Sequence, residues 1–191
     1  MKVLVISNFR VGSWWVHDMQ ASRGNEPVGE LLSNFYQNRD EKIQKWKDTA
    51  DVVGKLHPIQ LDNPDLWDEL IGLAGSKQFV QRRDTKAQCI SYAIATNQYY
   101  KKSEKERDEE HTKNIFLRDR EPYTGELTID DLDLAYTRLK QQQDLIESLY
   151  SKHGGNVLTL EDDLPRSPYQ NQYDYNDVKW NPPSQFEMLN G

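Results

Sequence analysis

The segment that decides the fold is Lys2-Val3-Leu4-Val5-Ile6-Ser7-Asn8-Phe9-Arg10-Val11-Gly12-Ser13-Trp14-Trp15-Val16-His17. Its short run of aliphatic and β-branched residues is typical of a buried parallel strand, and the turn after it leads into a helix. A helix that begins there presents amide donors and the positive end of its dipole. Arg10 and Ser13 add a charge and a hydroxyl, which suits phosphate or sulfate. An ordinary strand-to-helix turn has the same pattern, so other motifs have to support an anion site.

Strand and helix patterns alternate along the rest of the chain. Strands are expected at 51–56, 78–81 and 156–160, and helices at 27–37, 64–74, 84–100 and 129–152. Thr128 and Asp131 form a capping signal for the last helix, and Gly154-Gly155 ends it. This alternation predicts an α/β fold: a three-layer sandwich with a central, mainly parallel sheet flanked by helices.

Composition predicts one compact α/β domain at residues 1–164, followed by a Pro-, Asn- and Tyr-rich C-terminal extension at 165–191. The net charge of −7, with both signs mixed, argues against nucleic acid as a partner. The single cysteine, Cys89, excludes an internal disulfide. No signal peptide or long apolar span is recognised, so we expect a cytoplasmic protein without a membrane partner.

Two polar or aromatic segments have open interpretations. The charged run at 101–113 is expected to be a solvated helix end and loop, with a flap over a site as the alternative. The extension cannot build a core alone. Its aromatic residues are expected to pack onto the domain or to contact a ligand or partner, and they are Tyr169, Tyr173, Tyr175, Trp180 and Phe186.

Two more polar motifs follow predicted strands. Arg83 comes after the strand at 78–81, and Ser91 lies eight residues on, where both could reach one anion; alternatively Arg83 pairs with a nearby carboxylate. Lys55 and His57 lie at the end of the strand predicted at 51–56. They share a face, because residues two apart in a strand point the same way. A histidine beside a lysine is a candidate general base. The remaining histidines are assigned structural roles: His17, His111 and His153.

Together these motifs resemble sulfotransferases that use 3′-phosphoadenosine 5′-phosphosulfate (PAPS). Phe9-Arg10-Val11-Gly12-Ser13-Trp14-Trp15 is similar to the 5′-phosphosulfate loop of that family. Arg83 and Ser91 resemble its 3′-phosphate pair, and Lys55 with His57 resembles the lysine and catalytic histidine of the animal cytosolic branch. Leu158-Thr159-Leu160-Glu161-Asp162-Asp163-Leu164 is similar to a late family motif.

The resemblance implies a P-loop-like sulfotransferase architecture. It also implies transfer of a sulfuryl group from PAPS to a hydroxyl or amine of a small-molecule or carbohydrate acceptor, without a metal. The product is adenosine 3′,5′-bisphosphate. His57 is the expected base and first choice, and Lys55 and Arg10 are expected to neutralise the leaving oxygen. The cofactor is expected to contact Arg10, Val11, Gly12, Ser13, Trp14, Trp15, Arg83 and Ser91.

Several residues depart from the family pattern. Val11 and Trp14 stand where the family has hydroxyl residues, and Glu161 stands where it has a tyrosine. In a bacterial branch the base resembles a glutamate shortly after the first helix, which makes Glu30 the alternative base. A non-catalytic sulfotransferase-like binding protein is therefore a second interpretation. A P-loop nucleotide kinase is disfavoured, because no Gly-Lys-Ser or Gly-Lys-Thr follows the first strand.

Overall fold

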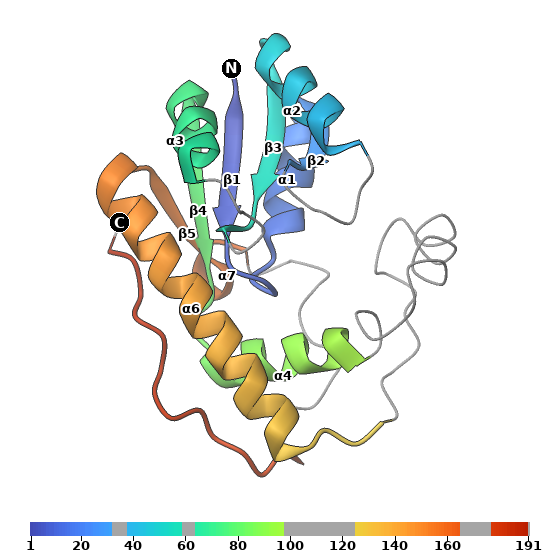
Figure 1. Ribbon diagram of the computed structural model, residues 1–191, viewed down its shortest axis with the longest axis vertical. Coiled ribbons are helices and arrows are strands. Elements are labelled where there is room, and N and C mark those ends of the chain that lie inside the picture. Colours follow the sequence, from blue (N-terminus) through green and yellow to red (C-terminus); the bar gives the residue numbers. More distant parts are fainter. Residues whose placement is uncertain (32–37, 59–63, 98–124, 165–176, 191) are drawn as a thin grey trace.

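The computed structural model describes residues 1–31, 38–58, 64–97, 125–164 and 177–190 (Figure 1). Its strands form one sheet in the order β2-β3-β1-β4-β5, and all neighbouring strands are parallel. The elements follow one another as β1 (Val3–Ser7), α1 (Ser13–Ser22), β2 (Glu26–Glu30), α2 (Arg39–Asp48), β3 (Val52–Leu56), α3 (Pro64–Leu73), β4 (Ser76–Gln81), α4 (Thr85–Ala95), α6 (Ile129–His153), β5 (Asn156–Thr159) and α7 (Leu160–Asp163). Because β1 is the middle strand, its carboxyl end is flanked by the ends of β3 and β4.

Helices cover both faces of the sheet. Along β1, Val3 and Val5 pack in a core with residues of α1 and α7, whereas Leu4 and Ile6 pack in a larger core with α2, α3 and α6. All five residues of β1 are buried, as expected for a parallel strand covered on both sides. The structure therefore confirms an α/β fold with a central parallel sheet between two helical layers.

Most of the predicted elements are confirmed. Strands β3, β4 and β5 form within or around the predicted runs, and α3, α4 and α6 form where the helical patterns lie. The capping box of α6 is present: the Thr128 hydroxyl accepts a hydrogen bond from the Asp131 amide at 3.1 Å, and the Asp131 carboxylate accepts one from the Thr128 amide at 3.2 Å. Gly154 caps the helix C-terminus, as its position in the sequence predicts.

The helix predicted at 27–37 is wrong where the structure describes it. Glu26–Glu30 forms strand β2, which pairs with β3. Pro27 and Gly29 are poor helix residues, and Val28 is buried in the core beside the sheet. Pairing with β3 therefore outweighs the apolar spacing on which the prediction rested. The rest of that range, 32–37, lies outside the described residues.

Helix α2 was not predicted, because its sequence is strongly charged and carries few apolar residues. Only Ile43 and Trp46 of this helix are buried. Trp46 packs closely on β3, where a Cβ added at Gly54 would lie 2.8 Å from Trp46 Cδ1. The absence of a side chain at Gly54 thus makes room for the tryptophan that holds α2 on the sheet.

The C-terminal segment 177–190 runs alongside α6 (Figure 1). Trp180 and Phe186 are buried in a cluster with residues of α4 and α6, and Trp180 Nε1 donates to Asp133 Oδ1 at 2.9 Å. Near the end of the chain, Leu189 N donates to Gln81 Oε1 at 2.8 Å. These two aromatic residues therefore pack onto the domain, which is one of the two outcomes that the sequence left open.

Some predictions lie outside the described residues. These are the charged run at 101–113, which includes His111, and the tail residues Tyr169, Tyr173 and Tyr175. Within the described ranges, no helix combines the length and the apolar composition needed to cross a membrane.

Candidate functional site

The turn after β1 is held from two sides. Asn8 Nδ2 donates to the Leu139 carbonyl of α6 at 2.9 Å, and Gln88 Nε2 of α4 donates to the Phe9 carbonyl at 2.8 Å. Arg10 and Gly12 adopt left-handed backbone conformations, with φ of 62° and 78°. The structure thus confirms the predicted order of strand, glycine-containing turn and helix. It also fixes the start of α1 at the carboxyl edge of the sheet.

Helix α1 begins at this turn without a side-chain cap. Gly12 is its N-cap residue and has no side chain that could cap the first amides, and its first turn carries no acidic residue. Ser13, its first residue, is buried. Amide donors and a hydroxyl therefore lie together at the positive end of the helix dipole, which is the arrangement that binds anions in other proteins.

Arg10, and not Arg83, forms the hydrogen bond with Ser91. Arg10 Nε donates to Ser91 Oγ at 2.8 Å, although the two residues are far apart in sequence. Arg82 Nη1 donates to the Arg10 carbonyl at 3.4 Å. Two of the predicted cofactor-binding residues, one on the turn and one on α4, are thus brought together beside the N-terminus of α1.

Arg83 pairs with a nearby carboxylate, which is the alternative that the sequence left open. Its guanidinium forms an ion pair with Asp162 of α7, and its backbone amide donates to Glu161 Oε2 at 3.0 Å. Arg83 and Ser91 therefore have different partners, Asp162 for the first and Arg10 for the second. The side chains of Arg83 and Asp162 are 59% and 53% exposed. An ion pair this exposed is worth about 1 kcal/mol or less, so a bound anion could displace Asp162 at little cost.

Glu30, Lys55 and His57 form one cluster at the carboxyl ends of β2 and β3. Glu30 Oε1 lies 3.0 Å from Lys55 Nζ and 3.5 Å from His57 Nε2. The His57 ring is oriented by its Nδ1–H, which donates to the Ser7 carbonyl at 2.9 Å. Lys55 and the expected general base, His57, therefore both face the same carboxylate oxygen of the alternative base, Glu30.

The side chains of Val11, Trp14 and Trp15 are not placed to bind an anion. Val11 and Trp15 pack in the core on the α1 side of the sheet. The Trp14 ring covers the ammonium of Lys55, which lies 4.0 Å from the ring centroid in a cation–π contact. At these three positions, only backbone groups remain to contact a phosphate or sulfate group.

Electrostatics keep Glu30 ionised and His57 neutral. Burial alone raises the pKa of Glu30, but the charge of Lys55 brings it well below its usual value. Burial and the charge of Lys55 lower the pKa of His57. Burial also lowers the pKa of Lys55, and Arg10 is near enough for its charge to lower it further. Arg10 therefore lies near enough to Lys55 for the two charges to influence each other.

Two members of the site were missed from the sequence. His17 was assigned a structural role, yet its ring packs edge-on against Trp14, with 5.1 Å between ring centroids. Its spacing of three residues from Trp14 on a helix was the available signal. Lys42 lies on the unpredicted α2; burial lowers its pKa, while the nearby charge of Glu30 opposes that shift. Nothing in the sequence alone placed Lys42 near Glu30.

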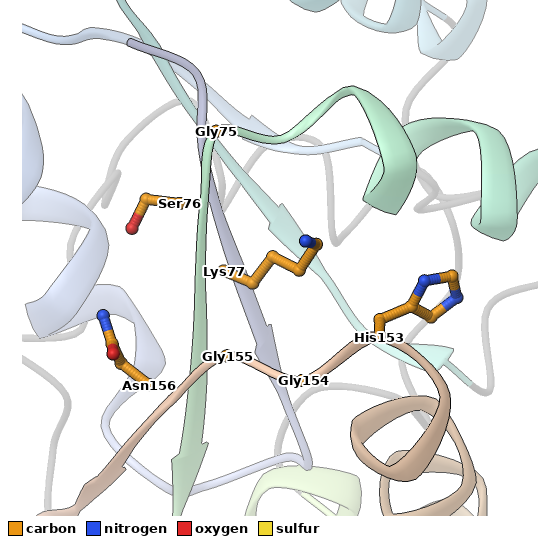
Figure 2. A pocket seen from close by; sticks show the side chains of 7 residues that line it. All are labelled: Gly75, Ser76, Lys77, His153, Gly154, Gly155 and Asn156. Carbon is orange, nitrogen blue, oxygen red and sulfur yellow. The ribbon is translucent and has the colours of Figure 1, made fainter.

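A separate polar pocket lies at the opposite edge of the sheet (Figure 2). Residues at the start of β4 and β5 line it, together with the end of α6, and its volume is about 230 Å³. It contains His153, whose Nε2 lies 2.8 Å from Asp68 Oδ1. Ligands of open α/β sheets bind beyond the carboxyl ends of the strands, so this pocket at the amino ends is not the candidate site.

The close packing at Gly12 leads to a prediction about stability. A Cβ added there would lie 2.7 Å from Leu160 Cδ1, which is buried, and φ is positive. Gly24 also has a positive φ, of 95°, but an added Cβ would meet nothing within 4 Å. We expect Gly12→Ala to lower the free energy of unfolding by at least about 1 kcal/mol more than Gly24→Ala, in urea denaturation. Equal losses would show that Leu160 moves aside freely.

Comparison of the chain with protein-family models, with curated proteins and with solved structures finds no significant match.

Proposed function

We propose that this protein is a sulfotransferase with a P-loop-like architecture that moves a sulfuryl group from PAPS to a hydroxyl or amine acceptor. The observation that carries the proposal is the convergence at one edge of the sheet. The uncapped start of α1, the Arg10–Ser91 pair and the Glu30 cluster all lie at the carboxyl ends of β1, β2 and β3 or beside them. An anion cradle next to a proton acceptor is what group transfer from a phosphosulfate requires.

The residues of the turn fit the 5′-phosphosulfate end of PAPS. The N-cap residue of α1, Gly12, has no side chain to cap the first amides, and Ser13 and Arg10 stand on either side of it. A side chain at Gly12 would collide with Leu160, so the turn packs closely on α7 at that point. Arg10 would stabilise the charge that develops on the leaving phosphate oxygen.

Arg83 and Ser91 remain the proposed contacts for the 3′-phosphate. Ser91 already lies beside a cation, Arg10. Arg83 is exposed and would exchange Asp162 for the phosphate, which gives a stronger, charge-assisted contact. Binding of the nucleotide would therefore rearrange Arg83 without disturbing the core.

Glu30 is the base that this geometry favours. His57 donates its Nδ1–H to a carbonyl, so in the neutral ring Nε2 is a proton acceptor that faces a second acceptor, Glu30 Oε1, at 3.5 Å. A hydroxyl placed there can donate its proton to either acceptor, and an amine can donate to both. The side chain of Glu30 is 15% exposed and that of His57 only 3%. Glu30 is thus the group that an acceptor reaches first, while Lys55 holds it in place.

The proposed transfer is an in-line displacement at sulfur. The acceptor oxygen or nitrogen forms a bond to sulfur, the bond from sulfur to the 5′-phosphate oxygen breaks, and the acceptor proton passes to Glu30. The leaving group is adenosine 3′,5′-bisphosphate. In a loose transition state of this kind, catalysis comes mainly from positioning and from neutralising the leaving oxygen.

Calorimetry with adenosine 3′,5′-bisphosphate tests the proposal without knowledge of the acceptor. We expect micromolar binding by the intact chain and binding about 10- to 100-fold weaker in Arg83→Ala, because a charge-assisted contact contributes about 1.5–3 kcal/mol. Arg138→Ala, which removes an exposed arginine of α6, is the matched control and should bind normally.

Two other results would overturn the assignment. No binding at millimolar nucleotide would favour the non-catalytic binding protein, for which the burial of Lys55 under Trp14 is the supporting observation. Activity that depends on magnesium would favour a nucleotide kinase-like phosphotransferase instead.

A further inference from the structure

His17 links helix α1 to the strand that carries Glu30. Its side chain is buried, and its Nε2 accepts a hydrogen bond from the Gly29 amide of β2 at 3.2 Å. A backbone amide can only donate, so Nε2 must be unprotonated and the ring must carry its proton on Nδ1, which faces Asp18 Oδ1 at 3.4 Å. Burial and the charge of Lys55 lower the pKa of His17 and favour this neutral form, against the opposing contact with Asp18.

The amide that His17 holds lies at a β-bulge. Pro27 pairs with Val53, but the next pairing is Gly29 with Gly54, so Val28 is an extra residue in β2. Gly29 has a φ of 70°, which is the left-handed conformation found in bulges. A bulge of this kind breaks the ladder locally and leaves a backbone group in need of another partner, and His17 supplies one.

The bulge decides which way Glu30 points. With it, Glu30 lies in register with Lys55, on the face of the sheet covered by α1. Without the extra residue, Glu30 would lie opposite Leu56. Because a shift of one residue turns a strand side chain to the other face, Glu30 would then point toward the core beneath α2 and α3.

We infer that His17 is a positioning residue: by accepting the Gly29 amide it fixes the β2 bulge that turns the Glu30 carboxylate toward Lys55 and His57. The inference rests on the proposed function only in taking Glu30 as the base. Trp14 joins the same unit, since its ring contacts that of His17 and covers Lys55.

The tautomer of His17 can be checked in the unmodified full-length chain. Long-range ¹H–¹⁵N NMR of the imidazole should show Nδ1 protonated and Nε2 unprotonated at neutral pH. A proton on Nε2 would overturn the inference, because that nitrogen could then not accept from Gly29. This measurement requires no substitution and therefore no assumption about folding.

Variants test the effect on Glu30 itself. In His17→Leu we expect the pKa of the Glu30 carboxyl, followed by ¹³C NMR, to rise by about 1 to 3 pH units, because the carboxylate loses its approach to Lys55. His17→Gln presents an amide oxygen close to the place of Nε2 and should restore most of the normal titration. Val16→Ala, which opens a cavity on the same helix away from the bulge, is the control for general loosening and should leave Glu30 unchanged.

The outcomes separate this inference from the proposed function. An unchanged titration of Glu30 in His17→Leu, or an equal change in Val16→Ala, would show that His17 is only a packing residue. Neither result depends on nucleotide binding. Conversely, if calorimetry showed no binding of adenosine 3′,5′-bisphosphate, the proposed function would be overturned. The NMR result on His17 and Glu30 would still stand.

Discussion

Glu30→Gln is expected to lower the rate of sulfuryl transfer by about 10²- to 10⁴-fold, the usual contribution of a general base, while the affinity for adenosine 3′,5′-bisphosphate stays the same. Glutamine has nearly the same shape, and its amide oxygen can still accept from Lys55, so the cluster should stay packed. It cannot take a proton from an acceptor. The loss should therefore appear in the chemical step and not in binding of the donor.

The measurement uses radiolabelled PAPS with a panel of phenols, alcohols, amines and sugars, followed by kinetics on whichever acceptor the intact chain uses. His57→Gln is the comparison and should show a smaller loss. A Glu30→Gln variant with near-normal turnover, together with an inactive His57→Ala, would return the role of base to His57, as the sequence first suggested.

The pH dependence distinguishes the same two residues. A general base works only when deprotonated, so the rate falls as pH falls through its pKa. The pKa of Glu30 lies well below its usual value of 4.5, so with Glu30 as base the rate should hold until the solution is strongly acidic. An acid limb at higher pH, between that expected for Glu30 and the ordinary imidazole value of 6.5, would instead indicate His57, whose pKa is lowered by burial and by the charge of Lys55.

Short-range patterns in the sequence were enough to predict the turn after β1 and one side of the site. The apolar run of β1, Gly12 and the helical pattern after it are all local signals, and the structure confirms them. The period of two along β3 placed Lys55 and His57 on one face, and both contact Glu30. These predictions held because each rests on geometry within one element.

The position of Glu30 could not be predicted, because it depends on pairing between strands. The spacing of apolar residues around Leu31 favours a helix. Only pairing with β3 makes Glu26–Glu30 a strand, and only the bulge at Gly29 sets its register. The partner of that bulge, His17, comes from another element again. Local propensity carries no information about such contacts.

The arginines show a different limit. Spacing suggested that Arg83 and Ser91 meet, but a long exposed side chain chooses among several partners of similar energy, and Arg83 pairs with Asp162. Ser91 is reached instead by Arg10, whose left-handed backbone directs it toward α4. Which cation faces which hydroxyl is decided by the conformation of the turn.

Lys55→Met is expected to lower the free energy of unfolding by about 3 to 5 kcal/mol at pH 8, the usual cost of removing one partner of a buried ion pair. The carboxylate of Glu30 would remain largely buried without its main counter-charge, and the cation–π contact with Trp14 would be lost. Burial of Lys55 itself is unfavourable, as the lowered pKa of its ammonium shows, so the native pair is stable only as a unit.

The sign of the pH dependence follows from Glu30. In the native chain its pKa is lower when folded than when unfolded, so it contributes stability above its usual value of 4.5, and this contribution is lost as pH falls further. In Lys55→Met, burial dominates and raises that pKa, so the carboxylate opposes folding at neutral pH and less so in acid. Urea denaturation should therefore show a larger deficit at pH 8 than at about pH 5. The double variant Lys55→Met/Glu30→Gln should recover most of the lost stability, because no buried charge is left unpaired. A double variant as unstable as Lys55→Met would contradict this. It would mean that packing around Lys55, and not its charge, holds the two strands together.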